Sequence, residues 1–214
     1  SRVRVHKTYM PGEDAHSSGR SIPALRPASF KTRRLFVRSL CADDLEEFSR
    51  NRARPEVAQY QSWGVEYTLQ DAQRLLDAQL LTAYGQSGSW HQLAIVRCED
   101  GQLLGDLAVH FCDFEDDSQA EVGFTLMAEH RRQGYGQEAL AGLLRHLFLD
   151  RGMRRVTATT DERNERAVTL LRAVGMRQEA LLRESSFWKG ELCSEYLFAM
   201  LASEFRLAAR DDVI

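Results

Sequence analysis

The segment Arg131-Arg132-Gln133-Gly134-Tyr135-Gly136 is the most informative local motif of this 214-residue sequence. A strand predicted over residues 120–126 precedes it, and a helix with an apolar stripe follows it. Backbone N–H groups at the start of a helix bind an anion such as a pyrophosphate. Gly134 and Gly136 lack the side chains that would keep a phosphate away from the backbone. The stretch therefore predicts a strand, an anion-binding loop and a helix, in that order.

Two other phosphate-binding motifs fit this stretch less well. A nucleoside-triphosphate loop places Lys and Ser or Thr after its last glycine, whereas this chain has Gln137-Glu138 there. A dinucleotide-binding fingerprint needs a third glycine where Ala139 stands, although alanine is tolerated at some such sites. Because short glycine motifs are common, an ordinary strand-to-helix turn also remains open for the motif taken alone.

The remaining sequence predicts a mixed α/β (α+β) domain around this motif. Apolar and alternating segments predict about six to seven strands, over residues 35–37, 92–96, 103–111, 120–126, 156–160, 178–187 and 192–200. Helical spacing of apolar residues predicts about four helices, over residues 43–50 and 70–84, from the glycine motif to about residue 148, and over 164–174. Asp100-Gly101 predicts a hairpin turn, and Arg54-Pro55-Glu56-Val57 predicts a break. We expect a flexible tail at residues 1–30, one domain at 31–206 and a second tail at 207–214.

Composition and charge narrow the class of protein. Hydrophobic residues make up 43% of the chain, which suffices for one continuous core. Apolar runs are too short to cross a bilayer, and residues 1–33 lack the apolar centre of a signal peptide. The formal net charge of -3 argues against a nucleic-acid binder. We therefore expect a cytoplasmic protein with neither a membrane nor a nucleic-acid partner.

The cysteines give no sign of a metal site. Cys41, Cys98, Cys112 and Cys193 are scattered, and none belongs to a Cys-x-x-Cys pair. Zinc ligands usually come in such close pairs, so we expect no metal and interpret the four residues as buried free thiols.

Several segments taken together resemble the GNAT (GCN5-related) N-acetyltransferase superfamily, and in particular its RimJ/RimL-like branch. The resemblance covers roughly residues 31–205. Its segments are Thr32-Arg33-Arg34-Leu35-Phe36-Val37-Arg38, Pro55-Glu56-Val57-Ala58-Gln59-Tyr60, Leu104-Gly105, Ala120-Glu121-Val122-Gly123-Phe124 with the glycine motif and Glu138-Ala139, Asn164-Glu165-Arg166-Ala167 with Val174-Gly175-Met176, and Lys189-Gly190 with Glu195-Tyr196. The resemblance implies a GNAT fold and direct transfer of an acetyl group from acetyl-CoA to a primary amine within a ternary complex. The amine would belong to a protein or peptide N-terminus or to a small molecule.

The resemblance also implies a cofactor site. Loop amides would bind the pyrophosphate of CoA, the two loop arginines would add charge, and the preceding strand would pair with the pantetheine arm through its backbone. The residues carried over are Phe124, Leu126, Met127, Arg131, Arg132, Gln133, Gly134, Tyr135, Gly136, Gln137 and Asn164. Each has an ordinary alternative: a solvated charge for the arginines, strand core for the apolar residues, and a helix N-cap for Asn164.

The catalytic groups are harder to assign. Glu121 stands where this branch often carries a carboxylate near the amine, and His110 could also accept a proton near neutral pH. Their alternatives are a polar residue on an exposed strand face and a structural or exposed histidine. Many GNAT enzymes have a tyrosine general acid where this chain has Leu171, so Ser185, Tyr196 or water would protonate the CoA thiolate. Ser194 also departs from the family, because the branch often has Asp there.

The acceptor and some general properties stay open. Tyr60, Trp63, Trp90 and Trp188 are candidates to line an acceptor pocket, Trp63 first among them, although aromatic residues more often form core. The acidic run Glu115-Asp116-Asp117 hints at a cationic acceptor, although such runs are usually only solvated. Two alternative functions are a non-catalytic acyl-CoA sensor or scaffold and an acyltransferase with another donor, such as succinyl-CoA. A homodimer is also left open.

Overall fold

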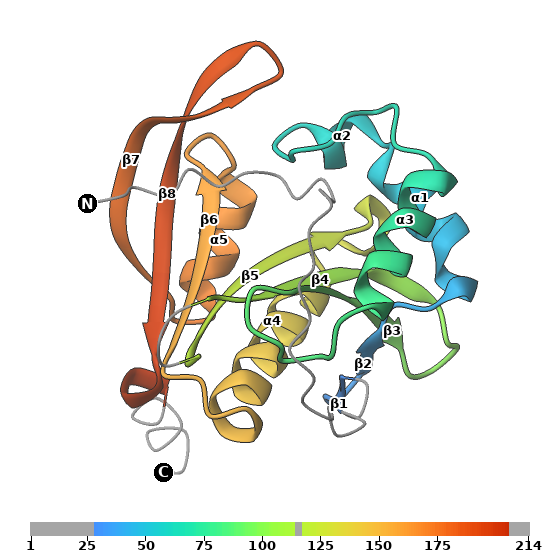
Figure 1. The fold of residues 1–214 in the computed structure, drawn as a ribbon, viewed down its shortest axis with the longest axis horizontal. Coiled ribbons are helices and arrows are strands. Elements are labelled where there is room, and N and C mark those ends of the chain that lie inside the picture. Colours follow the sequence, from blue (N-terminus) through green and yellow to red (C-terminus); the bar gives the residue numbers. More distant parts are fainter. Residues whose placement is uncertain (1–27, 114–116, 206–214) are drawn as a thin grey trace.

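One mixed β-sheet runs through the whole domain (Figure 1). The computed structural model describes residues 28–113 and 117–205, and within these ranges the sheet has eight strands in the order β1-β2-β3-β4-β5-β6-β8-β7. The strands are β1 Ser29–Lys31, β2 Leu35–Ser39, β3 Trp90–Arg97, β4 Leu103–Phe111, β5 Gln119–Leu126, β6 Arg155–Asp161, β7 Arg177–Trp188 and β8 Glu191–Leu201. Neighbouring strands are antiparallel except β5 and β6, which are parallel.

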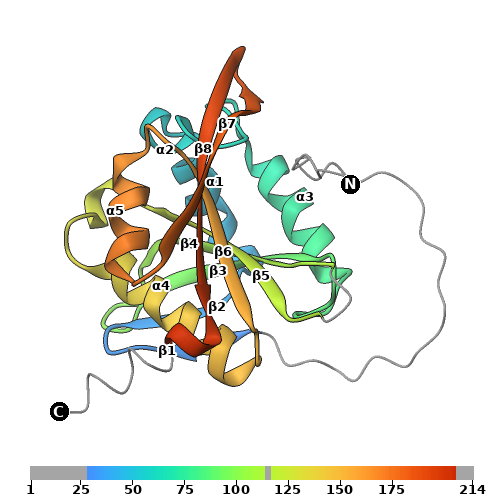
Figure 2. The same ribbon diagram turned by 90° about the vertical axis from the view of Figure 1, so that its left-hand side faces the viewer.

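Helices cover both faces of this sheet. In the described ranges they are α1 Leu45–Arg52, α2 Pro55–Ala58, α3 Leu69–Leu80, α4 Tyr135–Arg145 and α5 Glu165–Ala173, with short 3-10 turns η1 Ala42–Asp44 and η2 Ala128–His130 and a π-helical segment η3 His146–Asp150 that prolongs α4. The α4 and α5 helices pack on one face and the α1 and α3 helices on the other (Figures 1 and 2). The mixed α/β class predicted from the sequence is confirmed.

The counts differ from the prediction because two short elements lack a periodic signal. β1 is the strand that the sequence did not predict. Its three residues pair with β2, and Phe30 lies opposite Val37. α2 begins at Pro55, which occupies the first helical position after extended Arg54. Proline fixes φ near the helical value and is favoured there, so it both breaks the chain and starts a helix. Residues 1–27 and 206–214, which contain most of the two predicted tails, lie outside the described residues.

Two apolar clusters hold the three layers together. The larger lies between the sheet and α4, and includes Leu107, Leu140, Leu143 and Phe198, all without solvent exposure. The smaller lies between the sheet and α1 and α3, where fully buried Ala72 packs among the residues of the opposite face. Strand residues alternate between these two clusters, as the period of a strand requires. Each side chain of a central strand therefore faces either α4 or α1.

β5 and β6 diverge soon after they meet. Their parallel register joins only residues 119–121 of β5 to residues 155–157 of β6, whereas β5 pairs with β4 along its length from Ala120 to Leu126. Residues 122–126 of β5 thus form a backbone edge that faces the gap between the two strands. This opening of the sheet is the feature around which the candidate site is built.

Candidate functional site

The glycine motif forms a tight loop that ends at the start of α4. Gly134 is the N-cap and has φ 79°, and Arg132 also lies in the left-handed region with φ 60°. The first hydrogen bond of the helix runs from the Glu138 N–H to the Gly134 carbonyl at 3.0 Å. The N–H groups of residues 135–137 precede that bond and have no acceptor within the helix. The loop therefore presents backbone donors at the positive end of a helix dipole.

Gly136, in the first turn of α4, lies close to the end of β5 and to α5. A Cβ atom added to Gly136 would lie 3.4 Å from Leu170 Cδ2 of α5 and 3.9 Å from Leu126 Cδ2 of β5. A larger side chain would displace one of these two neighbours. The start of α4 therefore lies close to the end of β5 and to α5.

The predicted cofactor residues of β5 take two orientations. Phe124 and Leu126 are half-buried and pack against the α4-side cluster. Met127 has only 1% of its surface exposed and belongs to the cluster under α1 and α3. Its side chain thus faces away from α4, and a role of Met127 at the opening would fall to its backbone.

The loop arginines differ in their surroundings. Arg131 is half-buried and its Nε donates to the Leu126 carbonyl at 3.1 Å. Burial, reinforced by the charge of Arg166, lowers the pKa of Arg131. Arg132 is exposed. Arg166, the second residue of α5, was missed by the sequence reasoning, and its only signal was its place two residues after Asn164. Two arginines from different segments therefore bring positive charge to this opening.

The remaining polar loop residues make local bonds. Gln133 Nε2 donates to the Glu129 carbonyl at 3.0 Å, and Gln137 Nε2 donates to the Ala173 carbonyl at 3.4 Å. Asn164 Oδ1 accepts the Ala167 N–H at 3.2 Å and so caps α5. The N-cap interpretation of Asn164 is confirmed, and a contact of Asn164 with CoA stays a prediction.

The candidate bases lie side by side at the point where β5 and β6 part. His110 of β4 is directly opposite Glu121 of β5, and Glu121 is opposite Thr157 at the last paired position of β6. Trp90 of β3 stacks on His110 with ring centroids 4.6 Å apart and 7° between planes. Burial and the neighbouring charge of Glu121 raise the pKa of the Cys112 thiol to about 11. The structure thus brings Glu121, His110 and Trp90 into one row across three strands.

The candidate acids lie elsewhere. Tyr196 lines a cavity of about 310 Å³ with Glu162, Glu165, Val168, Thr169 and Arg172. Four of these residues belong to α5, whereas Leu170 of the same helix lies toward Gly136 at the start of α4. Ser185 sits in an exposed irregularity of β7, where its Oγ donates to the Leu182 carbonyl and to Glu195 Oε2. Leu171, at the position of the family tyrosine, is 1% exposed in the core. This placement gives no support to either residue as the acid, and both roles stay predictions.

The β7–β8 hairpin reaches over to the α2 segment. It rises beyond the rest of the sheet in both views (Figures 1 and 2). Lys189 Nζ, at the hairpin tip, donates to the carbonyl of Ala58 at the end of α2. Arg163 joins Asp161 at 2.7 Å and Glu191 at 3.3 Å, and its guanidinium lies 6.0 Å from the Tyr60 ring centroid. These contacts tie the hairpin, the β6–α5 turn and the α2 segment together.

A buried ion pair fixes α1 on the sheet. Arg52 Nη2 lies 3.2 Å from Asp106 Oδ2, with side chains 5% and 3% exposed. The Arg52 guanidinium also stacks on Trp63 at 3.9 Å and on Phe48 at 4.3 Å. Burial raises the pKa of Asp106, and the charge of Arg52 opposes this effect. Trp63, the favoured pocket aromatic, thus stacks on Arg52, eleven positions earlier in the chain.

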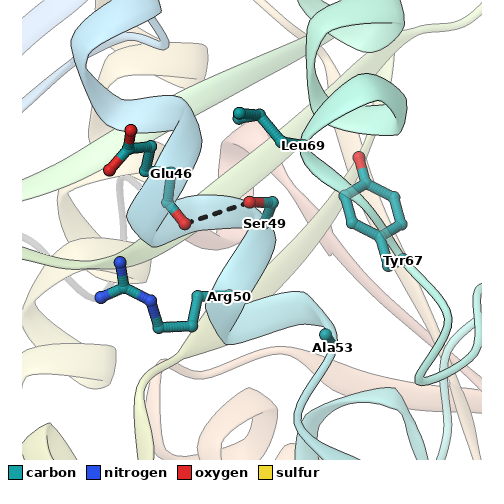
Figure 3. Close-up of a pocket in the computed structure, with 6 residues that line it drawn as sticks. All are labelled: Glu46, Ser49, Arg50, Ala53, Tyr67 and Leu69. Atoms are coloured by element: carbon teal, nitrogen blue, oxygen red, sulfur yellow. Dashed lines mark hydrogen bonds between the residues drawn. The ribbon is translucent and has the colours of Figure 1, made fainter.

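A further cavity of about 270 Å³ lies beside α1 (Figure 3). It is lined by Glu46, Ser49, Arg50, Ala53, Tyr67 and Leu69, between α1 and the start of α3. None of the residues predicted to bind CoA or to catalyse the reaction lines it, so we do not place the chemistry there.

Several general expectations can be set against the described residues. None of the four cysteines is paired, but only Cys193 is buried, and the expectation of buried thiols is wrong for exposed Cys98. Among residues 28–113 and 117–205, no group of His, Cys, Asp or Glu could hold a metal ion, and no helix is both long and apolar enough to span a membrane. Glu115 and Asp116 of the acidic run lie outside the described residues.

Comparisons with known proteins agree on one family. Residues 34–177 match the acetyltransferase (GNAT) domain. The chain is 24% identical to the uncharacterized N-acetyltransferase p20 of Bacillus licheniformis over 81% of this chain and 96% of that protein. Two solved structures share the fold with a TM-score of 0.71. One is the spermidine N-acetyltransferase of Vibrio cholerae in complex with CoA and spermine, 16% identical over 82% of this chain and 99% of that one. The other is the ribosomal-protein-S5-alanine acetyltransferase of Vibrio fischeri, 18% identical over 83% and 98%.

Proposed function

The chain belongs to the GNAT acetyltransferase family, and on that premise we propose that it transfers the acetyl group of acetyl-CoA to a primary amine at the opening between β5 and β6. The acceptor is the N-terminus of a protein or peptide, or a small-molecule amine, as in the RimJ/RimL-like branch that the sequence resembles. Because the amine attacks the thioester directly, the protein mainly positions two substrates and needs no covalent intermediate.

Binding of acetyl-CoA is supported mainly by one observation: the glycine loop lies close to the backbone edge of β5. The N–H groups of residues 135–137 at the start of α4 have no acceptor within the helix, so they can bind an anion, and Gly136 keeps the backbone accessible beside Leu126 and Leu170. Arg131 and Arg166 add positive charge. The side of residues 122–125 that β6 does not pair with offers backbone groups to the amides of the pantetheine arm.

Glu121 is the base that the geometry favours for the acceptor half. Its backbone stands at the last paired position of β5 and β6, which supports a role for its carboxylate near the opening. His110, its cross-strand neighbour, is the second candidate. A neutral amine is the nucleophile, and either group can accept its proton directly or through a water. For the CoA thiolate, water is the simplest proton donor, since Leu171 is buried in the core.

The proposal is tested by incubating the protein with acetyl-CoA and a panel of amines and N-terminal peptides while free thiol is followed. Acceptor-dependent thiol release with one equivalent of acetylated amine is expected. Tight CoA binding without release across a broad panel would favour a non-catalytic sensor. Faster release with succinyl-CoA than with acetyl-CoA would assign another donor. Absence of CoA binding would contradict the proposal as a whole.

A further inference from the structure

Glu138 anchors the first turn of α4 to the N-terminal strands. Its Oε1 accepts hydrogen bonds from Thr32 Oγ1 at 2.6 Å and from the Arg34 N–H at 2.7 Å. Its Oε2 accepts from Arg34 Nε at 2.6 Å. Burial opposes ionisation of Glu138, but the bonds from Thr32 and Arg34 outweigh it and hold the pKa of this carboxyl below its usual range. The charged carboxylate is thus fixed in the first turn by residues more than a hundred positions away in sequence.

The same guanidinium also holds the loop. Arg34 Nη1 donates to the Gln133 carbonyl at 3.0 Å, and the guanidinium carbon lies 4.3 Å from the Tyr135 ring centroid. Between these two residues stands Gly134 in its left-handed conformation, and Arg34 Nη2 is 3.3 Å from where a Cβ of Gly134 would lie. Arg34 therefore contacts the loop on both sides of the glycine as well as the first turn of the helix.

The ion pair of Glu138 with Arg34 also affects how the start of α4 interacts with an anion. A carboxylate in the first turn favours the helix, but it repels an anion that approaches the same helix end. Pairing with Arg34 neutralises the charge of the Glu138 carboxylate and so removes this repulsion. The backbone N–H groups at the start of α4 stay available to an anion. The planar fork of arginine can bond a carboxylate and a carbonyl at once, which the single ammonium of lysine does less well.

We propose that Arg34 is a positioning residue for the donor, which acts through Glu138 and the Gln133 carbonyl to hold the amides of residues 134–137 in the arrangement that binds a pyrophosphate. This inference rests on the proposed function, because it assumes that CoA is the ligand of the loop. It assigns to the turn between β1 and β2 a role in donor binding at a distance from the reacting atoms.

The test compares R34Q, R34K, E138Q and the double variant R34Q/E138Q with the wild-type chain. Two ligands are used: CoA, and S-acetylpantetheine, a donor that lacks the pyrophosphate. The matched control is R155Q, which breaks the bidentate pair of Arg155 with Glu179 at 2.6 and 3.0 Å, remote from the loop. Thermal unfolding of each variant verifies that it folds.

The expected result is a rise of about tenfold in the Kd for CoA in R34Q, R34K and E138Q, by the strength of charge-assisted hydrogen bonds. The double variant should be no weaker than R34Q, since both changes break one unit. Rates with S-acetylpantetheine, and the Kd for CoA in R155Q, should stay within about twofold of wild type.

Other outcomes would overturn the inference. A wild-type Kd in R34K would show that charge alone matters, and a wild-type Kd in E138Q would show that Arg34 does not act through Glu138. A loss of the rate with S-acetylpantetheine as large as the loss of CoA affinity would indicate a general structural defect. If the wild-type chain fails to bind CoA, the proposed function itself fails, and this result is distinct from a variant that loses a measured affinity.

Discussion

Replacement of Gly134 by alanine probes the loop at its most constrained point. Gly134 has φ 79°, a conformation that costs an L-residue about 1–2 kcal/mol. The added Cβ would also lie 3.3 Å from Arg34 Nη2, so the guanidinium has to shift from its place beside the loop. If the loop of the G134A variant leaves the left-handed conformation in the absence of CoA, binding of CoA must restore that conformation. That penalty corresponds to a rise of roughly 5- to 30-fold in the Kd for CoA.

Gly101 supplies the matched control for this prediction. It has φ 75° in the turn between β3 and β4, and a Cβ added there meets no atom within 4 Å. G101A therefore carries the same backbone strain without a neighbour in the candidate site. Calorimetric titration with CoA gives the Kd of each variant, and urea unfolding gives its stability. A wild-type Kd in G134A, or equal weakening in G101A, would refute the reasoning that places the pyrophosphate on this loop.

Three further predictions follow from the same contacts. D106N should lower the free energy of unfolding by about 3–5 kcal/mol in urea titrations, because it leaves the Arg52 guanidinium buried without its carboxylate; a loss under about 1 kcal/mol would contradict the importance of this pair. E121Q should lower the turnover number while the Kd for CoA stays nearly unchanged, and unaltered rates across the pH range would remove Glu121 as the base. For Glu138, whose folded-state pKa is lowered, the stability lost in E138Q should be full above about pH 4.5 and vanish as pH falls through the folded-state pKa. Urea unfolding at several pH values checks this, and a difference that grows in acid would contradict it.

Local sequence patterns predicted most of the fold because its long elements are periodic. The helix after Gly134 and the helix from Glu165 both carry apolar residues at helical spacing, and both lie where expected. β1 and α2 are too short for a period to show, and their formation depends on neighbours: β2 for the strand, and the first-turn proline for the helix. The glycine motif was predictable because φ and close packing restrict those positions to glycine.

Contacts between distant segments could not be predicted in the same way. Arg34 and Glu138 are 104 positions apart, and Arg52 and Asp106 are 54 apart, so no local pattern joins them. The side of α5 that Tyr196 faces depends on the strand order β6-β8-β7, which one sequence does not reveal. The stacking of Trp63 on Arg52 also escaped prediction, and a role of Trp63 in an acceptor pocket stays a prediction.

The most direct test of the central claim is the map of backbone amide shifts when CoA is added to the 15N-labelled chain. We expect the largest shifts in residues 132–137 at the start of α4, in residues 122–127 along and after β5, and near Asn164 at the start of α5. Small shifts there, together with large ones around Glu46 and Tyr67 at the cavity beside α1, would contradict the claim that the opening between β5 and β6 is the donor site.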